Sequence, residues 1–261
     1  MGTVSGNFLI GTSGYNYPHW RGRFYPTGLP SKDRITHYAD HFNSVELNVT
    51  FYRLRLAKTF EAWRERTPTG FSFSLKGSRF ITHLKRLQDA ADALGTFLER
   101  AAMLGEKLSI VLWQLPPGLH ADSAKLQDFL ETLRSHPIGN RIRHAFEFRH
   151  KSWFEDETYA LLSQYRCALC IADAPRWPKV RETTAEYVYV RFHGSERLYG
   201  SCYSPKELEE WGGQIALWLT RGLDVYCYFN NDAEGYAISN AQDLRGIVSR
   251  KTVRNIRNSG S

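Results

Sequence analysis

The sequence predicts an α/β fold, a single eight-stranded (β/α) barrel of the TIM type with parallel strands, and three observations predict it. The chain has 261 residues, which is close to the usual size of such a barrel. Eight short apolar runs alternate with longer segments of helical periodicity. No G-x-G-x-x-G motif follows a predicted strand, which disfavours a doubly wound open sheet, the second architecture that we considered.

The eight predicted strands are apolar runs bounded by turn-forming or polar residues. They cover residues 8–13, 44–52, 70–76, 108–115, 144–150, 167–173, 187–194 and 225–232. Because helical segments separate them, the strands are expected to be parallel and joined by right-handed crossovers.

The predicted helices repeat apolar residues with a period near 3.6. They cover residues 34–42, 58–66, 85–104, 121–133, 156–165 and 240–250, and one more begins after Ser204. There, Ser204 is expected to cap the helix, Pro205 to be its first residue, and Glu207 to complete a capping box. The connection 173–186 contains two prolines and little periodicity, so we expect a loop without a full helix.

Composition assigns residues 1–248 to the barrel and residues 249–261 to a basic flexible tail. The tail holds four of the charges that make the net charge +7, so the rest of the chain carries only +3. This mild excess is weak evidence for a nucleic-acid partner. There is neither a transmembrane stretch of about 20 apolar residues nor a signal peptide, so we expect a cytoplasmic protein without a membrane partner.

Polar side chains alternate with apolar ones along several predicted strands. Phe146 and Phe148 lie on one face of their strand, and Glu147 and Arg149 lie on the other. Since the phenylalanines should face the helices, the charged side chains should point into the barrel. The same alternation turns inward Glu46, Asn48, Lys76, Arg191, His193, Asn230 and Asp232.

These inward groups cluster near the carboxyl ends of the strands, where barrel enzymes carry their active sites. A buried unpaired charge costs several kcal/mol, so the groups must pair with each other or meet solvent and ligand. Two interpretations remain open. The groups form a ligand site, or they form a buried ion-pair network that only stabilises the barrel.

Several segments together resemble the YecE-like family, domain of unknown function 72. They are GTSGYNYPHWRGRFYP, VELNVTFYR, FSFSLKGSRFITH, QLPPG, FEFRHKSW, IADAP, VRFHG and YFNNDAEGYAISNA, and they extend from Gly11 to about Leu244. The resemblance implies a (β/α) barrel and brings no settled activity. This chain has Tyr15 where the family pattern has tryptophan, which keeps an aromatic side chain near the mouth.

We expect an enzyme that binds a small anionic substrate, phosphorylated or carboxylated, at the mouth. Arginine matches phosphate and carboxylate oxygens, and loops after the last two strands often hold phosphate in such barrels. Glu147 and His193 are the candidate acid–base pair, since histidine ordinarily titrates near neutrality, and Asp173 is a third candidate catalytic residue. The candidate substrate-binding residues are Arg149, Arg191, Lys76, Glu46, Asn48, Asn230, Asp232 and Tyr15.

Three alternatives remain at this point. Glu147, Asp173 and His193 could hold a divalent metal, with His150 and Asp232 in reserve, but nearby arginines make this less favoured. Glu46 and Glu147 could serve a glycosidase. The barrel could also bind nucleic acid or a nucleotide without catalysis, through an aromatic cluster at Tyr15, Tyr17, Trp20, Phe24 and Tyr25, although a hydrophobic lid explains that cluster better. The sequence assigns no cofactor and no oligomeric state.

Overall fold

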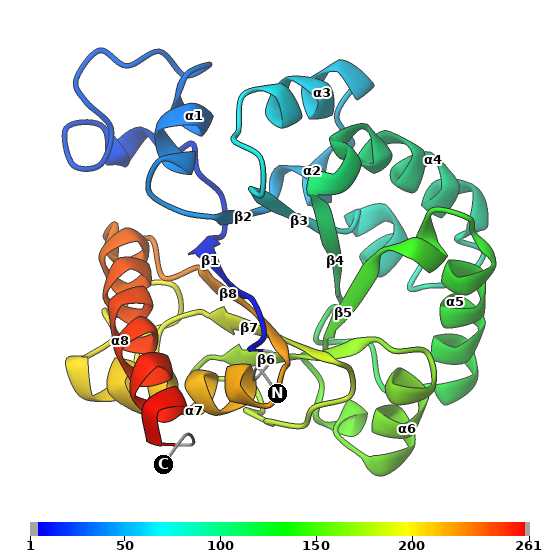
Figure 1. Ribbon diagram of the computed structural model, residues 1–261. Coiled ribbons are helices and arrows are strands. Elements are labelled where there is room, and N and C mark those ends of the chain that lie inside the picture. Colours follow the sequence, from blue (N-terminus) through cyan, green and yellow to red (C-terminus); the bar gives the residue numbers. More distant parts are fainter. Residues whose placement is uncertain (1–4, 259–261) are drawn as a thin grey trace.

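The computed structural model describes residues 5–258, and eight parallel strands surrounded by helices form its centre (Figure 1). The strands are β1 Phe8–Thr12, β2 Ser44–Leu47, β3 Ser72–Lys76, β4 Leu108–Gln114, β5 Arg143–Glu147, β6 Ala168–Asp173, β7 Tyr187–Phe192 and β8 Asp224–Phe229. Their order is β1-β8-β7-β6-β5-β4-β3-β2. The predicted TIM-type barrel is therefore confirmed, with one strand for each predicted run.

Side chains help to close the barrel between β1 and β2, the two ends of this order. The Asn43 amide accepts a hydrogen bond from the Ile10 amide at 3.0 Å and donates one to the Phe8 carbonyl at 2.8 Å. Nearer the mouth, Ser13 and Glu46 form an isolated parallel bridge. Glu46 therefore lies at the closure of the barrel.

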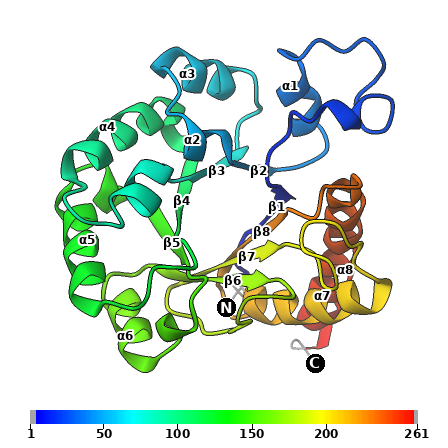
Figure 2. The ribbon, with the colours of Figure 1, turned by 180° about the vertical axis from the view of Figure 1, so that it is seen from behind.

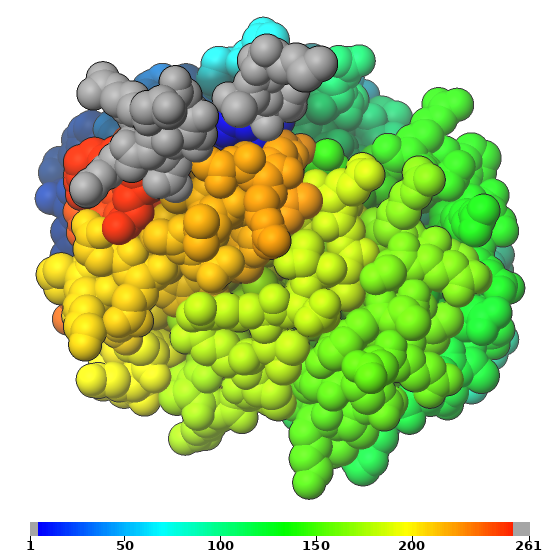
Figure 3. Space-filling view, turned by 60° about the horizontal axis from the view of Figure 1, so that its bottom comes forward, coloured from blue at the N-terminus to red at the C-terminus, as the bar shows by residue number. Residues whose placement is uncertain are grey.

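The helices lie outside the strands, as seen from both directions (Figures 1 and 2). They are α1 Arg34–Ala39, α2 Val49–Tyr52, α3 Ala57–Glu65, α4 Ala91–Ala101, α5 Ser123–Ser135, α6 Asp156–Gln164, α7 Pro205–Thr220 and α8 Tyr236–Asn258. The segments that carry α5 to α8 succeed one another around one side of the surface, from green through yellow to orange and red (Figure 3).

Two predicted boundaries near the mouth lie furthest from the observed ones. The strand predicted over 44–52 ends at Leu47, because the chain turns directly into α2. The helix predicted from residue 85 begins only at Ala91. Arg86, Leu87 and Asp89 have positive φ angles of 51°, 72° and 44°, which a right-handed helix cannot contain.

The last two helices pack side by side (Figures 1 and 2). The capping box between Ser204 and Glu207 is present at the start of α7. Helix α8 continues to Asn258, so helix replaces most of the tail expected over 249–261, and residues 259–261 lie outside the described residues. Lys251 pairs with Glu209 of α7 at 2.8 Å, which provides one reason for the longer helix.

The connection after β6 contains no helix between residues 174 and 186, as predicted. Within residues 5–258, no helix combines the length and the apolar character that crossing a membrane would require.

Hydroxyl groups fill the middle of the barrel, below its mouth. Large tyrosines from β7 and β8 reach small serines on β2, β3 and β4 on the other side. The pairs are Ser44–Tyr228 at 2.6 Å, Ser74–Tyr189 at 2.6 Å and Ser109–Tyr226 at 2.9 Å. Because these buried hydroxyls are hydrogen-bonded to each other, the polar interior carries little desolvation penalty.

Candidate functional site

Three strands bring two carboxylates and one guanidinium together inside the barrel. Arg191 of β7 donates through Nη1 to Glu147 of β5 at 2.5 Å and through Nη2 to Glu46 of β2 at 2.7 Å. All three residues have 0% exposure. The predicted inward direction of these side chains is therefore correct. The structure also realises the ion-pair network that the sequence left open as an alternative.

Further donors complete the hydrogen bonding of Glu46. Ser13 Oγ donates to Oε1 at 2.5 Å, and Tyr189 Oη donates to Oε2 at 2.6 Å. Burial alone would raise the pKa of this carboxyl, but Arg191 and these hydroxyl donors outweigh burial, so the pKa is lowered. Glu46 is thus a fixed anion whose lone pairs are largely used within the protein.

Glu147 is held in a similar way but reaches closer to the rim. Arg149 donates through Nε to Glu147 Oε1 at 2.8 Å. Burial would raise the pKa of the Glu147 carboxyl, yet Arg191, Arg149 and His193 hold that pKa well below its usual range. Glu147 is therefore ionised and serves as an acceptor rather than as an acid at neutral pH.

His193 lies directly after β7, beside this carboxylate. Its Nε2 is 3.8 Å from Glu147 Oε2, and Asn230 Nδ2 is 3.1 Å from its Nδ1. An amide donor at Nδ1 leaves the ring proton on Nε2, facing Glu147. Burial and the charge of Arg191 lower the pKa of His193 to about 4, below the near-neutral value that is ordinary for histidine.

Two cations form the rim above the carboxylates. The guanidinium carbon of Arg149 lies 3.9 Å from the centroid of the Trp177 ring, and its side chain retains 14% exposure. Lys76, at the end of β3, is 8% exposed, and its Nζ lies 4.1 Å from the centroid of the Phe51 ring. Among residues 5–258, Lys76 has no carboxylate within salt-bridge distance and donates no side-chain hydrogen bond.

Asp173 does not join this group. Its carboxylate accepts from Trp211 Nε1 at 2.6 Å and pairs with Lys179 at 2.7 Å. It shares the outward face of β6 with Leu169 and Ile171, which belong to the core outside the barrel. The same alternation that predicted the other residues explains why Asp173 faces α7.

Asp232 and Tyr15 bind the segment after β1 to the barrel. Asp232 accepts from Trp20 Nε1 at 3.0 Å and pairs with His19 at 2.8 Å. The Tyr15 hydroxyl instead accepts from Trp63 of α3 at 2.9 Å. These two predicted substrate-binding residues are therefore engaged in structural contacts.

Asn48 lies just beyond β2, at the N-cap of α2. Its Oδ1 is covered and has no hydrogen-bond donor among the described residues. Asn48 therefore retains a buried, unused acceptor.

The aromatic cluster after β1 is a packed lid. Trp20 and Tyr25 each have 1% exposure, and their rings lie 5.9 Å apart. Buried rings cannot stack on nucleic-acid bases, which argues against the use of this cluster for base recognition.

Ser13, Tyr189, Trp177 and His83 are site residues that the sequence interpretation missed. Tyr189 could have been found, because it alternates in phase with Arg191 along β7. The pKa of His83 is lowered to about 4 by burial and by Lys76, which assigns it to the same electrostatic environment. Trp177 lies in an irregular loop whose path no local pattern predicts.

A metal site does not arise from the predicted ligands. Within residues 5–258, no three His, Cys, Asp or Glu side chains are grouped in a way that could hold a metal ion. Arg191 and Arg149 surround Glu147, and Asp173 points away from His193. The two glutamates proposed for a glycosidase are likewise bridged by Arg191.

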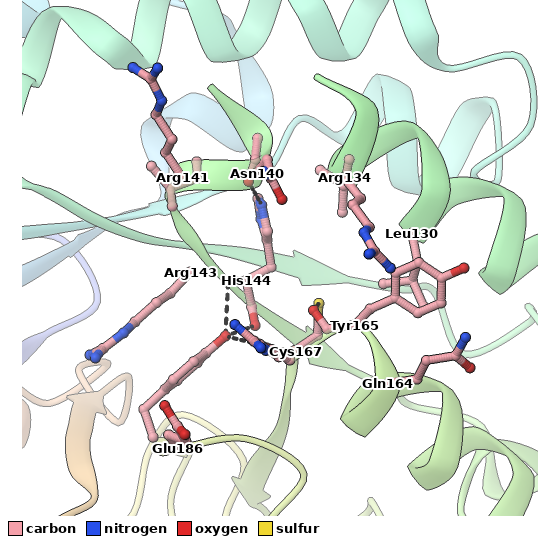
Figure 4. A pocket seen from close by; sticks show the side chains of 15 residues that line it. Leu130, Arg134, Asn140, Arg141, Arg143, His144, Gln164, Tyr165, Cys167 and Glu186 are labelled. Atoms are coloured by element: carbon pink, nitrogen blue, oxygen red, sulfur yellow. Dashed lines mark hydrogen bonds between the residues drawn. The ribbon is translucent and has the colours of Figure 1, made fainter. Parts of the chain in front are cut away.

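Cavities occur elsewhere on the molecule. One of about 430 Å³ lies at the amino end of β5 and is lined by Arg134, Arg141, Arg143, His144 and Tyr187, among others (Figure 4). Another, of about 810 Å³, is lined by residues that include Ser72, Asp224 and Tyr226. Neither contains a residue predicted for the site.

The chain matches the family model described as protein of unknown function DUF72 over residues 9–259. It is 26% identical to the UPF0759 protein YunF of Bacillus subtilis (strain 168), over 86% of this chain and 89% of YunF. It is 30% identical to the UPF0759 protein YecE of Escherichia coli (strain K12), over 56% of this chain and 49% of YecE.

A crystal structure of a DUF72 family protein from Thermotoga maritima MSB8 aligns with a TM-score of 0.82 and 29% sequence identity, covering 93% of this chain and 99% of that chain. The fold, the family model and these relatives agree. The chain belongs to the DUF72 family of proteins of unknown function.

Proposed function

We propose that this protein is an enzyme that binds a small anionic substrate, bearing a phosphate or a carboxylate, at the carboxyl-terminal mouth of the barrel. One observation carries the proposal. Three basic side chains, Lys76, Arg149 and Arg191, face only two carboxylates, Glu46 and Glu147, in this part of the described chain, so a protonated Lys76 has no carboxylate left to pair with. An anionic ligand supplies the missing charge in a region of low dielectric constant.

The cations have different roles in this proposal. Arg191 is fully buried between the two glutamates, so it positions them and does not contact the substrate. Arg149 uses only Nε within the network, which leaves its terminal nitrogens for a forked contact with an anion. Lys76 provides a second nitrogen donor at the rim, and Asn48 offers an acceptor to a hydroxyl or amide of the substrate.

Glu147 and His193 are the proton-handling pair. The carboxylate is ionised, so Glu147 can take up a proton without a preceding titration step, and the neutral imidazole can donate its Nε2–H as a hydrogen bond. Asn230 fixes the ring orientation through Nδ1. In this proposal Asp173, Asp232 and Tyr15 have structural roles, through the contacts described above.

Calorimetric titration with inorganic phosphate and pyrophosphate tests the anion site. We expect Arg149→Leu and Lys76→Met each to weaken binding about tenfold or more, a loss of about 1.4 kcal/mol. Arg141→Leu is the matched control, because Arg141 is exposed and lines the cavity at the opposite end of the barrel. Equal weakening by the Arg141 variant would contradict the proposal.

The salt dependence separates this proposal from the binding of a polyanion. A single small anion should give a shallow slope of log K against log salt, whereas contacts with many phosphates of a nucleic acid give a steep one. A steep slope with single-stranded oligonucleotides, together with no phosphate binding, would favour the non-catalytic alternative.

A further inference from the structure

Lys76 is a buried amine for which the described residues provide no counterion. Charged lysines are almost never buried without a partner, because desolvating the ammonium group is costly. Lys76 is 8% exposed, its Nζ lies over the Phe51 ring, and Ser74 is the nearest residue on the same face of its own strand. Ser74 is already hydrogen-bonded to Tyr189.

The charged and titratable groups around Lys76 come from five elements or loops. They are Glu46 on β2, His83 after β3, Glu147 on β5, Arg149 beyond β5, and Arg191 on β7. Both carboxylates are already paired with arginines, so the surroundings of the Lys76 amine disfavour its protonated form. Burial and the positive charge of Arg191 lower the pKa of Lys76 to about 7.

We propose that Lys76 is a catalytic nucleophile that forms an imine with the carbonyl group of an anionic aldehyde or ketone. This inference rests on the proposed function and narrows its substrate class to carbonyl compounds that carry a phosphate or carboxylate. Lysines in apolar surroundings or beside other cations are the ones that proteins use for such chemistry.

The reaction forms a C=N bond between Nζ and the substrate and releases one water molecule. The lone pair of the neutral Nζ attacks the carbonyl carbon, and the carbonyl π electrons move to oxygen. Two protons leave nitrogen in turn and two protons are added to oxygen, so that the C–O bond breaks, one water molecule departs and a C=N bond remains. No oxidant or reductant is required. Arg149 holds the substrate anion, and Glu147 with His193 can exchange the protons.

Reductive trapping with pyridoxal 5′-phosphate, an aldehyde that carries a phosphate, tests the inference. Hydride from sodium borohydride converts the imine carbon to a stable secondary amine, and peptide mass spectrometry locates it. We expect Lys76 to be labelled at least about tenfold faster at pH 7.5 than exposed Lys58 or Lys32, since a larger fraction of its amine is neutral. The rate at Lys76 should level off above about pH 7–8.

Controls separate the nucleophile from the anion site. Lys76→Met should abolish the fast label and leave the slow labels unchanged, and Lys76→Arg should not restore it. Arg149→Leu should slow labelling by pyridoxal 5′-phosphate but not by pyridoxal, which lacks the phosphate. Inorganic phosphate should protect Lys76 from the phosphorylated probe.

The outcomes distinguish the two proposals. If Lys76 reacts no faster than exposed lysines with either aldehyde, the imine inference is overturned, even where phosphate binding is intact. If both aldehydes label Lys76 equally fast and phosphate does not protect it, the nucleophile is supported but the anionic substrate class is overturned.

Discussion

Arg191 donates to Glu147 across 2.5 Å while both side chains have no exposure to solvent. Such a contact joins two strands through the inside of the barrel and cannot be replaced by water. Breaking a buried pair by removing one partner is far more costly than replacing the whole pair by apolar groups. The first prediction follows from this asymmetry.

Arg191→Met should lower the free energy of unfolding by about 3–5 kcal/mol, because it leaves Glu46 and Glu147 buried without their cation. Urea unfolding at pH 7 measures this loss. Adding Glu46→Gln and Glu147→Gln to the variant should recover part of this loss, since the neutral amides remove the uncompensated charge.

Arg197→Met is the control. Arg197 is 69% exposed in its pair with Glu234, so this substitution should cost at most about 1 kcal/mol. An Arg191→Met variant as stable as the parent would show that the network does not stabilise the barrel.

Lys76→Met should stabilise the protein near neutral pH. The pKa of Lys76 is lowered to about 7 in the folded state, whereas an unfolded lysine titrates near about 10.4. Between these values the unfolded chain binds more protons, so the parent gains stability as the pH rises, by up to about 1.4 kcal/mol per pH unit. The variant should lack this rise and should exceed the parent by at least about 1 kcal/mol at pH 6–7. Urea unfolding from pH 6 to 10 measures both, with exposed Lys58→Met as a control that should change little.

The buried histidines should make the fold sensitive to mild acid. His193 and His144 have pKa values lowered to about 4, first by burial, whereas unfolded histidine titrates near about 6.5. Their stabilisation is complete above pH 6.5 and is lost as the pH falls toward 4, at up to about 1.4 kcal/mol per pH unit for each ring. Glu46 and Glu147 lose their contribution to the free energy of unfolding only at pH values below the ordinary carboxyl pKa, because folding lowers their pKa values too. The pH dependence of urea unfolding tests this, and His193→Asn should make the slope between pH 6.5 and 4 shallower. An NMR signal of His193 that titrates near pH 6.5 in the folded protein would contradict the prediction.

Asp232 should control the stability of the lid after β1. Asp232→Ala leaves the Trp20 indole N–H without its acceptor while Trp20 is 1% exposed, which should cost about 1–3 kcal/mol. Asp232→Asn keeps one acceptor oxygen and should have a smaller effect. Trypsin should cleave after Arg21 and Arg23 faster in the Ala variant. Glu234→Ala, which removes an exposed partner of Arg197, should leave the cleavage rate unchanged.

The sequence by itself determined the eight strands and the inward direction of Glu46, Lys76, Glu147 and Arg191. Neighbouring side chains on a strand point to opposite faces, and this is a local property of the backbone. Where the apolar residues must face the helices, their neighbours therefore point into the barrel. The same rule, applied to Leu169 and Ile171, would have turned Asp173 outward.

Only the tertiary structure decided which inward groups meet. The partnership of Arg191 with two glutamates depends on which strands face each other across the barrel, and that is set by closure rather than by any local pattern. The position of Trp177 beside Arg149, and the use of Asp232 to hold Trp20, depend on irregular loops. The low pKa of His193 also depends on the tertiary structure, because its first cause is burial inside the closed barrel, to which the charge of nearby Arg191 adds.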